Sequence, residues 1–234
     1  MNGKEDICLI EKTKRFRVNG SGPKRKELSA YKILDNISST IVKDLLLITN
    51  ERKDNDLGSD TYEISSLCNY KDVFNAEHNY RQILLQTKLE KNSQPTDEYA
   101  YSVWDKRVDK KLIKHLEFLF GKIFRFRISV MNKDHHLNWH IDTDTSVICR
   151  AQICLNENDS SFEFNIKGKK FELLTNPGDV YFINTGWPHR VVTRKKDRIV
   201  AIFGFKFENA CDEIKSAIYA TNDMSSSKHV SITI

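Results

Sequence analysis

The chain reads KIFRFRISVM over residues 122–131, with apolar side chains at every even position from 124 to 130. A period of two places these side chains on one face of a β-strand. Seven further short segments with strand character follow, separated by turns rich in Asn, Asp, Gly and Lys. They are 137–142, 147–155, 161–167, 169–174, 179–184, 188–193 and 198–206. About eight strands in roughly 85 residues predict an antiparallel double-sheet jelly roll of the cupin type, a double-stranded β-helix.

Four segments outside this run have apolar residues at helical spacing. They are 39–50, 76–89, 112–120 and 208–220. The third is the clearest, since Asp109 lies near its start and Gly121 lies just past its end. The predicted fold class is therefore α+β, with the jelly roll braced by N-terminal helices and a C-terminal helix.

The chain has 234 residues, of which 39% are hydrophobic and 29% charged, enough for a sizeable core in one domain. We divide it into a basic flexible leader (1–28), a helical support region (29–121), the jelly-roll core with its closing helix (122–220) and a polar tail (221–234). Residues 1–30 hold eight Lys or Arg and four acidic residues, so they carry most of the net charge of +5. A nucleic-acid-binding arm would have this charge, but a loosely ordered terminus has it more often. We expect the leader to be dispensable for catalysis.

Composition also bears on location. The longest apolar runs cover only a few residues, far short of a membrane span. The N-terminus carries charge where a secretory signal has its apolar segment. Five cysteines form no C-x-x-C pair, and their odd number argues against a disulfide framework. We predict a cytoplasmic protein without membrane contact, with Cys149 and Cys154 as buried thiols on opposite faces of one strand. The oligomeric state stays open.

The residues with metal-binding chemistry are His140, Asp142 and His189. Residues two apart in a strand point to the same face, so His140 and Asp142 converge. His189 follows a Pro-Gly-Asp turn at 177–179 and a strand, and it begins another strand, where a jelly roll would place a third ligand. Two histidines and one carboxylate form the facial triad of non-haem Fe(II), which leaves coordination positions for a co-substrate and O₂.

Arg198 lies nine residues after His189. If residues 194–197 form a hairpin turn, Thr193 faces Arg198 and His189 faces Ile202, so Arg198 and His189 point into one cavity. They are then four residues apart along the sheet, about 13 Å. This distance fits a five-carbon diacid bound to metal at one end and to a guanidinium at the other, which indicates 2-oxoglutarate.

The stretch 129–205 resembles the aspartyl/asparaginyl β-hydroxylase-like branch of the Fe(II)/2-oxoglutarate-dependent dioxygenases. Besides the triad, the matching residues are Ser129, Cys149-Arg150, PGDVYFIN at 177–184, WPHRVV at 187–192 and Asp197-Arg198-Ile199. The resemblance implies that the triad binds iron and that Arg198 binds the far carboxylate of 2-oxoglutarate. It also implies that Ser129 and Arg150 hold the cosubstrate. Members often have a histidine where this chain has Gln152, and we assign Gln152 to the same subsite because an amide can still donate to a carboxylate.

By this resemblance the chain uses Fe(II), 2-oxoglutarate and O₂ to hydroxylate an amino-acid side chain, free or within a peptide or protein, and releases succinate and CO₂. One alternative is a nucleic-acid-directed oxygenase of the same class. That branch usually carries a second arginine six positions after the first, where this chain has Gly204. Another alternative is a non-catalytic cupin that binds a metal such as Zn(II). Arg125 and Arg127 either contact an acidic group of the substrate or line the solvated end of the sheet.

Four further residues near the triad have ordinary structural interpretations. His135 and His136 lie in a polar loop and are expected to be exposed. Trp139 and Trp187 flank the ligands and are expected to pack in the core rather than to contact substrate.

Overall fold

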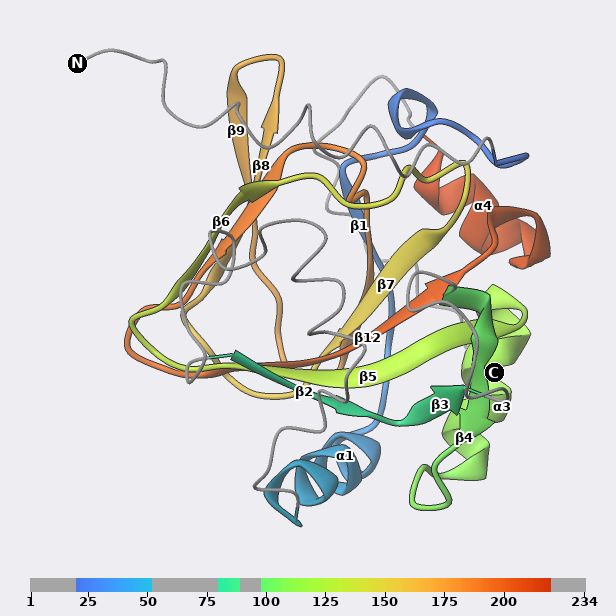
Figure 1. Cartoon of the computed structure of the whole chain (residues 1–234), viewed down its shortest axis with the longest axis vertical. Coiled ribbons are helices and arrows are strands. Elements are labelled where there is room, and N and C mark those ends of the chain that lie inside the picture. The colour runs from blue at the N-terminus through green and yellow to red at the C-terminus, as the bar shows by residue number, and fades with distance from the viewer. Residues whose placement is uncertain (1–19, 52–79, 89–97, 220–234) are drawn as a thin grey trace.

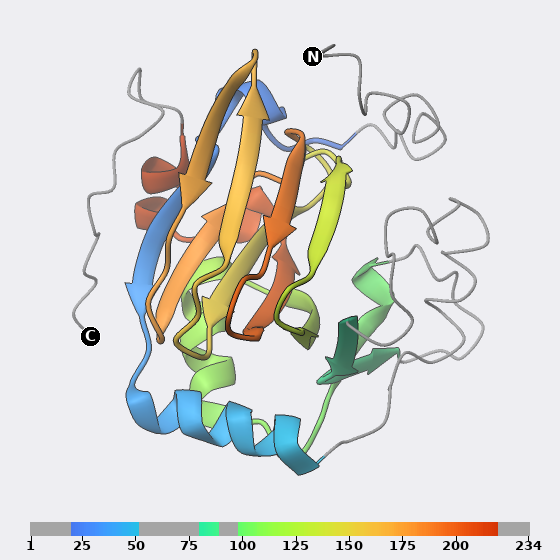
Figure 2. The same ribbon diagram turned by 90° about the vertical axis from the view of Figure 1, so that its left-hand side faces the viewer.

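A computed structural model describes residues 20–51, 80–88 and 98–219 of the chain, and its strands form two main antiparallel sheets and one small sheet (Figures 1 and 2). The strands are β1 Tyr31–Asn36, β2 Tyr80–Leu84, β3 Gln86–Lys88, β4 Tyr101–Trp104, β5 Ile123–Met131, β6 His136–His140, β7 Cys149–Cys154, β8 Ser161–Ile166, β9 Lys169–Leu173, β10 Asp179–Ile183, β11 His189–Val192 and β12 Arg198–Phe205. The six-stranded sheet has the order β1-β10-β7-β12-β5-β2, and the four-stranded sheet has the order β6-β11-β8-β9. β3 and β4 form the small sheet.

The six-stranded sheet is buried on both faces. One face meets the four-stranded sheet, and the other shares a core with helices α1 (Ser39–Glu51), α3 (Lys110–Phe120) and α4 (Asp212–Ile218) (Figure 2). Successive side chains of β7 and β12 therefore lie in two different environments. Odd positions such as Ala151 and Phe203 join the core beside the helices. Even positions such as Gln152 and Arg198 line a pocket between the sheets.

All eight strands expected from residue 122 onward form, as β5 to β12. One boundary matters for the site, because β6 ends at His140 and Asp142 lies in the following loop instead of on the strand as predicted. The backbone N–H of Asp142 donates to the carbonyl of Thr185, 3.0 Å away, in the loop before β11. This bond takes the place of a ladder hydrogen bond and directs the chain away from β6.

The predicted hairpin between β11 and β12 is wrong. β11 pairs with β6 and β8, whereas β12 pairs with β5 and β7 in the other sheet. Residues 193–197 therefore cross from one sheet to the other instead of making a tight turn. His189 and Arg198 still line the same pocket, because it lies between the inner faces of the two sheets.

The N-terminal half contains more strand than the sequence predicts. The helix expected near 76–89 is wrong over its described residues, which form β2 and β3. β2 pairs with β5 and satisfies backbone groups that would otherwise form an open sheet edge. Ile83 is fully buried in the core beside the helices, and Gln82 faces the pocket. β1 and β4 also lie in the region expected to be helical.

Three helices confirm their sequence patterns. α1 covers 39–51, close to the expected 39–50. α3 is capped by Asp109, whose side chain accepts from the backbone N–H of Lys111 at 2.8 Å, and it ends at Gly121, where φ is +67°. α4 is shorter than the predicted 208–220, because residues 207–209 form a separate 3₁₀ turn. Among the described helices, none has the length and apolar character needed to cross a bilayer.

The described end of the leader is packed against the body. Residues 25–27 form a 3₁₀ turn, and Leu28 is only 1% exposed in the core beside the helices. The flexible leader predicted for 1–28 therefore does not extend through residues 20–28, because apolar burial at Leu28 and hydrogen bonds to two loops hold that segment. Residues 1–19 and the predicted polar tail at 221–234 lie outside the described residues.

Candidate active site

Three predicted metal ligands meet at one end of the inner pocket. His140 is the last residue of β6 and is paired across the sheet with His189, the first residue of β11. Asp142 Oδ1 lies 4.0 Å from His140 Nε2, and Asp142 Oδ2 lies 4.0 Å from His189 Nε2. One ligand atom from each of the three residues falls within 4.8 Å of the other two. This spacing lets the three side chains bind one metal ion.

Both imidazole rings are held in the orientation that metal binding needs. His140 Nδ1 lies 2.7 Å from the carbonyl oxygen of Asn138, and His189 Nδ1 lies 2.9 Å from that of Trp187. A carbonyl oxygen only accepts, so each Nδ1 carries the proton and donates. Each Nε2 then has a free lone pair facing Asp142, which is the tautomer of a metal ligand.

The electrostatic surroundings favour the same protonation states. Burial lowers the pKa of His189 to about 4, and repulsion from His140 adds to this effect. Desolvation opposes ionisation of Asp142, although its side chain is 39% exposed, but the positive side chains around it, Arg150 and Arg127 among them, outweigh this effect and lower the pKa of that carboxyl group. At neutral pH the site therefore holds a neutral imidazole at His189 and a carboxylate at Asp142, as metal coordination requires.

Arg198 is a buried cation in the same pocket, with 6% of its surface exposed. Its Nη2 donates to Gln152 Oε1 at 2.6 Å and to the Tyr181 hydroxyl at 3.2 Å. Among the described residues, Arg198 has no carboxylate partner, and Nη2 makes its hydrogen bonds. The rest of the guanidinium fork is therefore available to an anion, and a buried unpaired cation favours binding one.

Gln152 and Tyr181 hold this guanidinium. Burial raises the pKa of Tyr181 to about 12, so its hydroxyl keeps its proton and donates to Gln152 Oε1 at 2.7 Å. Gln152 thus accepts from both Arg198 and Tyr181 in the described structure. Its observed contact is with the arginine, whereas the sequence predicted a contact with the cosubstrate itself.

All seven residues assigned to the site from the sequence line this pocket. Ser129 comes from β5 and Arg150 from β7, and both are buried. Sequence reasoning missed Tyr181, which contacts Gln152 and Arg198 and lies within the motif at 177–184. It also missed Gln82 on β2, because that segment was predicted to be helical. Arg127, whose role the sequence left open, lines the pocket as well.

Two predictions about neighbouring residues have different outcomes. His135 is buried, contrary to the prediction, because the segment that precedes β6 packs beside Thr193, whose hydroxyl accepts from the His135 backbone N–H at 2.9 Å. His136 is exposed, as expected. The thiols of Cys149 and Cys154 are free and buried in different cores, which confirms their placement on opposite strand faces.

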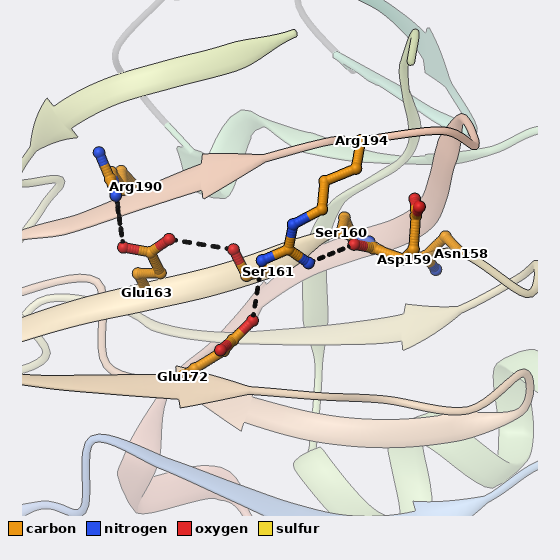
Figure 3. Close-up of polar contacts among 8 residues, drawn as sticks. All are labelled: Asn158, Asp159, Ser160, Ser161, Glu163, Glu172, Arg190 and Arg194. Atoms are coloured by element: carbon orange, nitrogen blue, oxygen red, sulfur yellow. Dashed lines mark hydrogen bonds and ion pairs between the residues drawn. The ribbon is translucent and has the colours of Figure 1, made fainter. Parts of the chain in front are cut away.

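The outer face of the four-stranded sheet carries residues of the motif that point away from the site. Arg190 Nε donates to Glu163 at 2.8 Å, and Ser161 donates to the same carboxylate at 3.0 Å (Figure 3). Further along this face Arg194 approaches Glu172 (Figure 3). The Arg190 guanidinium carbon also lies 5.0 Å from the ring centroid of Trp139. Trp139 therefore packs on the outer face of the sheet, and the prediction that it packs in the core is wrong. Arg190 thus stabilises the sheet that holds His189.

Comparisons with known proteins give distant structural similarities only. No protein-family model matches the chain, and a comparison with curated proteins finds no match. Similar solved structures include a prolyl-4-hydroxylase from Pseudomonas putida, which is 14% identical over 76% of this chain and 93% of that chain, with a TM-score of 0.49.

Two other structures have comparable similarity. HygX from Streptomyces hygroscopicus, solved with nickel, 2-oxoglutarate and hygromycin B, is 13% identical over 76% of this chain and 83% of that chain, with a TM-score of 0.46. The collagen prolyl hydroxylase of Paramecium Bursaria Chlorella virus-1 is 11% identical over 75% and 94% of the two chains, with a TM-score of 0.41. At these identities and scores, the assignment of function rests on the chain's own residues.

Proposed function

We propose that the chain is an Fe(II)/2-oxoglutarate-dependent dioxygenase that hydroxylates an amino-acid side chain, either free or within a peptide or protein. The observation that carries this proposal is the pairing of two features in one pocket. A two-histidine, one-carboxylate cluster lies at one end, and a buried arginine without a carboxylate partner among the described residues lines the same pocket. Neither feature has an evident structural purpose, and together they match a metal-chelated diacid.

We also infer that the fold is a double-stranded β-helix. From β5 to β12, the chain visits the six-stranded and four-stranded sheets in the order six, four, six, four, four, six, four, six. This winding places β6 and β11 beside each other, so the histidines that come 49 positions apart in the sequence become cross-strand neighbours. The motif match to the aspartyl/asparaginyl β-hydroxylase-like branch supports the same fold.

The donor set fits Fe(II). Imidazole and carboxylate ligands suit this ion, and three protein ligands leave positions for a bidentate cosubstrate and O₂. The carbonyls of Asn138 and Trp187 fix the two rings, which is the outer support that metal-ligating histidines normally have. His140, Asp142 and His189 would therefore hold the metal.

The far carboxylate of 2-oxoglutarate would pair with Arg198. Gln152 and Tyr181 orient the guanidinium before the ligand arrives, which reduces the entropy lost on binding. Ser129 and Arg150 line the same pocket and would contact the cosubstrate nearer the metal. When bound, the iron supplies the oxidation of 2-oxoglutarate by O₂ to succinate and CO₂ with hydroxylation of the substrate. The protein binds, orients and shields the reactants.

One observation weighs against the nucleic-acid-directed alternative. The position that carries the second arginine in that branch is Gly204 here, beside Ile148 and Arg150, so the chain has no guanidinium at this place. The cytoplasmic location also remains a proposal, and the three described cysteines are free as it requires.

The test has two stages. Anaerobic addition of 2-oxoglutarate to the Fe(II)-loaded protein should produce a metal-to-ligand absorption band, which a Zn(II)-loaded protein cannot produce. A screen of amino acids, peptides and oligonucleotides would then measure succinate release coupled to product formation. Absence of the band, with Zn(II) bound tightly, would favour a metal-binding cupin. Turnover only with oligonucleotides would favour the nucleic-acid-directed enzyme.

A further inference from the structure

The segment 20–28, here named the N-terminal strap, lies at the end of the sheets where the metal ligands meet. In Figure 2 the strap is the darkest blue part of the described chain, and it crosses the end at which β6 stops and β11 begins. Two loops lie under it. The Asp142 loop (residues 141–148) joins β6 to β7, and the His189 loop (residues 184–188) joins β10 to β11.

The first part of the strap is attached to the Asp142 loop. Gly22 N–H donates to the carbonyl of Ser146 at 2.9 Å, and the buried hydroxyl of Thr145 donates to the carbonyl of Pro23 at 3.0 Å. The backbones approach so closely that a Cβ atom at Gly20 would lie 1.8 Å from Ser146 O. Only glycine allows this contact, so the strap and this loop are fitted to each other.

The second part is attached to the His189 loop through Arg25. Its Nη1 donates to the carbonyl of Gly186 at 2.8 Å, and its guanidinium carbon lies 5.1 Å from the ring centroid of Trp187. In return, the buried amide of Asn184 donates to the carbonyls of Arg25 and Ser29, at 2.8 and 3.1 Å. A charge-assisted hydrogen bond and a cation–π contact therefore fix residues 186 and 187.

Both loops connect directly to the ligands. Trp187 supplies the carbonyl that accepts from His189 Nδ1 at 2.9 Å, so the position of Trp187 sets the orientation of that ring. Asp142 donates its backbone N–H to Thr185, so a shift of the His189 loop also moves Asp142. The strap thus touches both loops from outside the jelly-roll core.

We propose that the N-terminal strap fixes the metal site by joining the two loops, with Arg25 as a positioning residue for His189. This inference rests on the proposed metal site and adds a role for the leader that the sequence did not predict. Without the guanidinium, the carbonyl of Gly186 loses its charged donor, and the His189 loop can relax away from the orientation that aims Nε2 at Asp142. Metal affinity should then fall although His140, Asp142 and His189 themselves are not substituted.

The experiment measures Co(II) binding by the full-length chain, because Co(II) reports its coordination through visible absorption bands. Arg25→Ala should raise the Kd for Co(II) by roughly tenfold, the lower end of the cost of losing an outer-shell partner, and should change the bands. Arg25→Lys keeps the charge and should restore part of the affinity. Lys26→Ala is the matched control, since it removes a neighbouring exposed cation, and it should leave binding unchanged.

A second variant weakens the attachment of the strap to the Asp142 loop without altering Arg25. Thr145→Val removes the hydroxyl that donates to Pro23 while keeping the buried volume, and it should raise the Kd for Co(II) several-fold. Wild-type Kd and wild-type bands in Arg25→Ala would overturn the proposal, even if the melting temperature of the metal-free protein fell. A wild-type chain that binds no Co(II) would instead overturn the metal site itself, and the strap's role with it.

Discussion

Arg198→Ala gives the most direct test of the cosubstrate assignment. The guanidinium is 6% exposed and has no carboxylate partner among the described residues, so a bound carboxylate would be its main counter-charge. Truncating one partner of a buried charge-assisted pair costs about 2–5 kcal/mol, which corresponds to a fall in affinity of roughly 30-fold or more. Arg198→Lys keeps the charge but loses the planar fork, so we expect a smaller loss.

The same variant should have little effect on the stability of the metal-free protein. Gln152 and Tyr181 keep the hydrogen bond between them after the arginine is removed, so neither buried side chain is left without a partner. The variant also removes the desolvation penalty of a buried cation without a counter-charge, and this gain offsets the lost hydrogen bonds. Loss of 2-oxoglutarate affinity with an unchanged melting temperature would therefore identify a binding role.

The assay is an anaerobic titration of the Fe(II)-loaded protein with 2-oxoglutarate, followed by the metal-to-ligand absorption band. Arg194→Ala is the matched control, because Arg194 lies on the connection just before β12, is half exposed, and pairs with Glu172 on the outer face. Equal affinities in wild type and Arg198→Ala would refute the assignment and favour a metal-binding cupin.

Asp142→Ala should abolish turnover and strongly reduce iron occupancy, because it removes one of the three ligands. Iron is measured by metal analysis after desalting, and full iron occupancy with full turnover would disprove the triad. The metal-free protein should lose stability as pH falls from about 6.5 to about 4, because the unfolded chain binds a proton at His189 that the folded chain excludes. The loss should be at most about 3 kcal/mol, and in denaturant titrations His189→Asn should lack this pH dependence. Asp109→Ala should lower the free energy of unfolding by about 1 kcal/mol through loss of the α3 cap, without changing 2-oxoglutarate affinity.

The sequence was most informative where one local pattern dominates. Strands β5 to β12 follow from alternating apolar residues and turn-forming residues, and α3 follows from its apolar face, its Asp109 cap and Gly121. The triad and Arg198 could be found because each has chemistry that a core does not need, whereas Ser129, Arg150 and Gln152 were assigned through the family resemblance. The sequence placed Arg198 in the correct pocket although it wrongly paired β11 with β12 in one hairpin. The two strands lie in opposed sheets, and the inner faces of both sheets line the same pocket.

The failures share a physical cause, which is contact between distant segments. β2 has apolar residues at a spacing compatible with a helix, and its pairing with β5 overrides that preference. The burial of His135 depends on Thr193, far along the chain. The strap depends on loops more than 100 residues away, such as the 161-residue separation between Arg25 and Gly186. No window of sequence contains these interactions.

Substitutions on the two faces of the six-stranded sheet should have separate effects, one on the pocket and the other on the core beside the helices. On β7 and β12, odd positions pack beside the helices, whereas the even positions Arg150, Gln152, Arg198 and Ile202 face the pocket. Substitutions on opposite sides of the sheet share few partners, so their free energies should add. A lineage can therefore acquire a new ligand preference through changes at positions such as Ile202 while its thermal stability drifts independently through positions such as Phe203. Libraries for altered specificity should vary the inward-facing set alone and leave the other set as the scaffold.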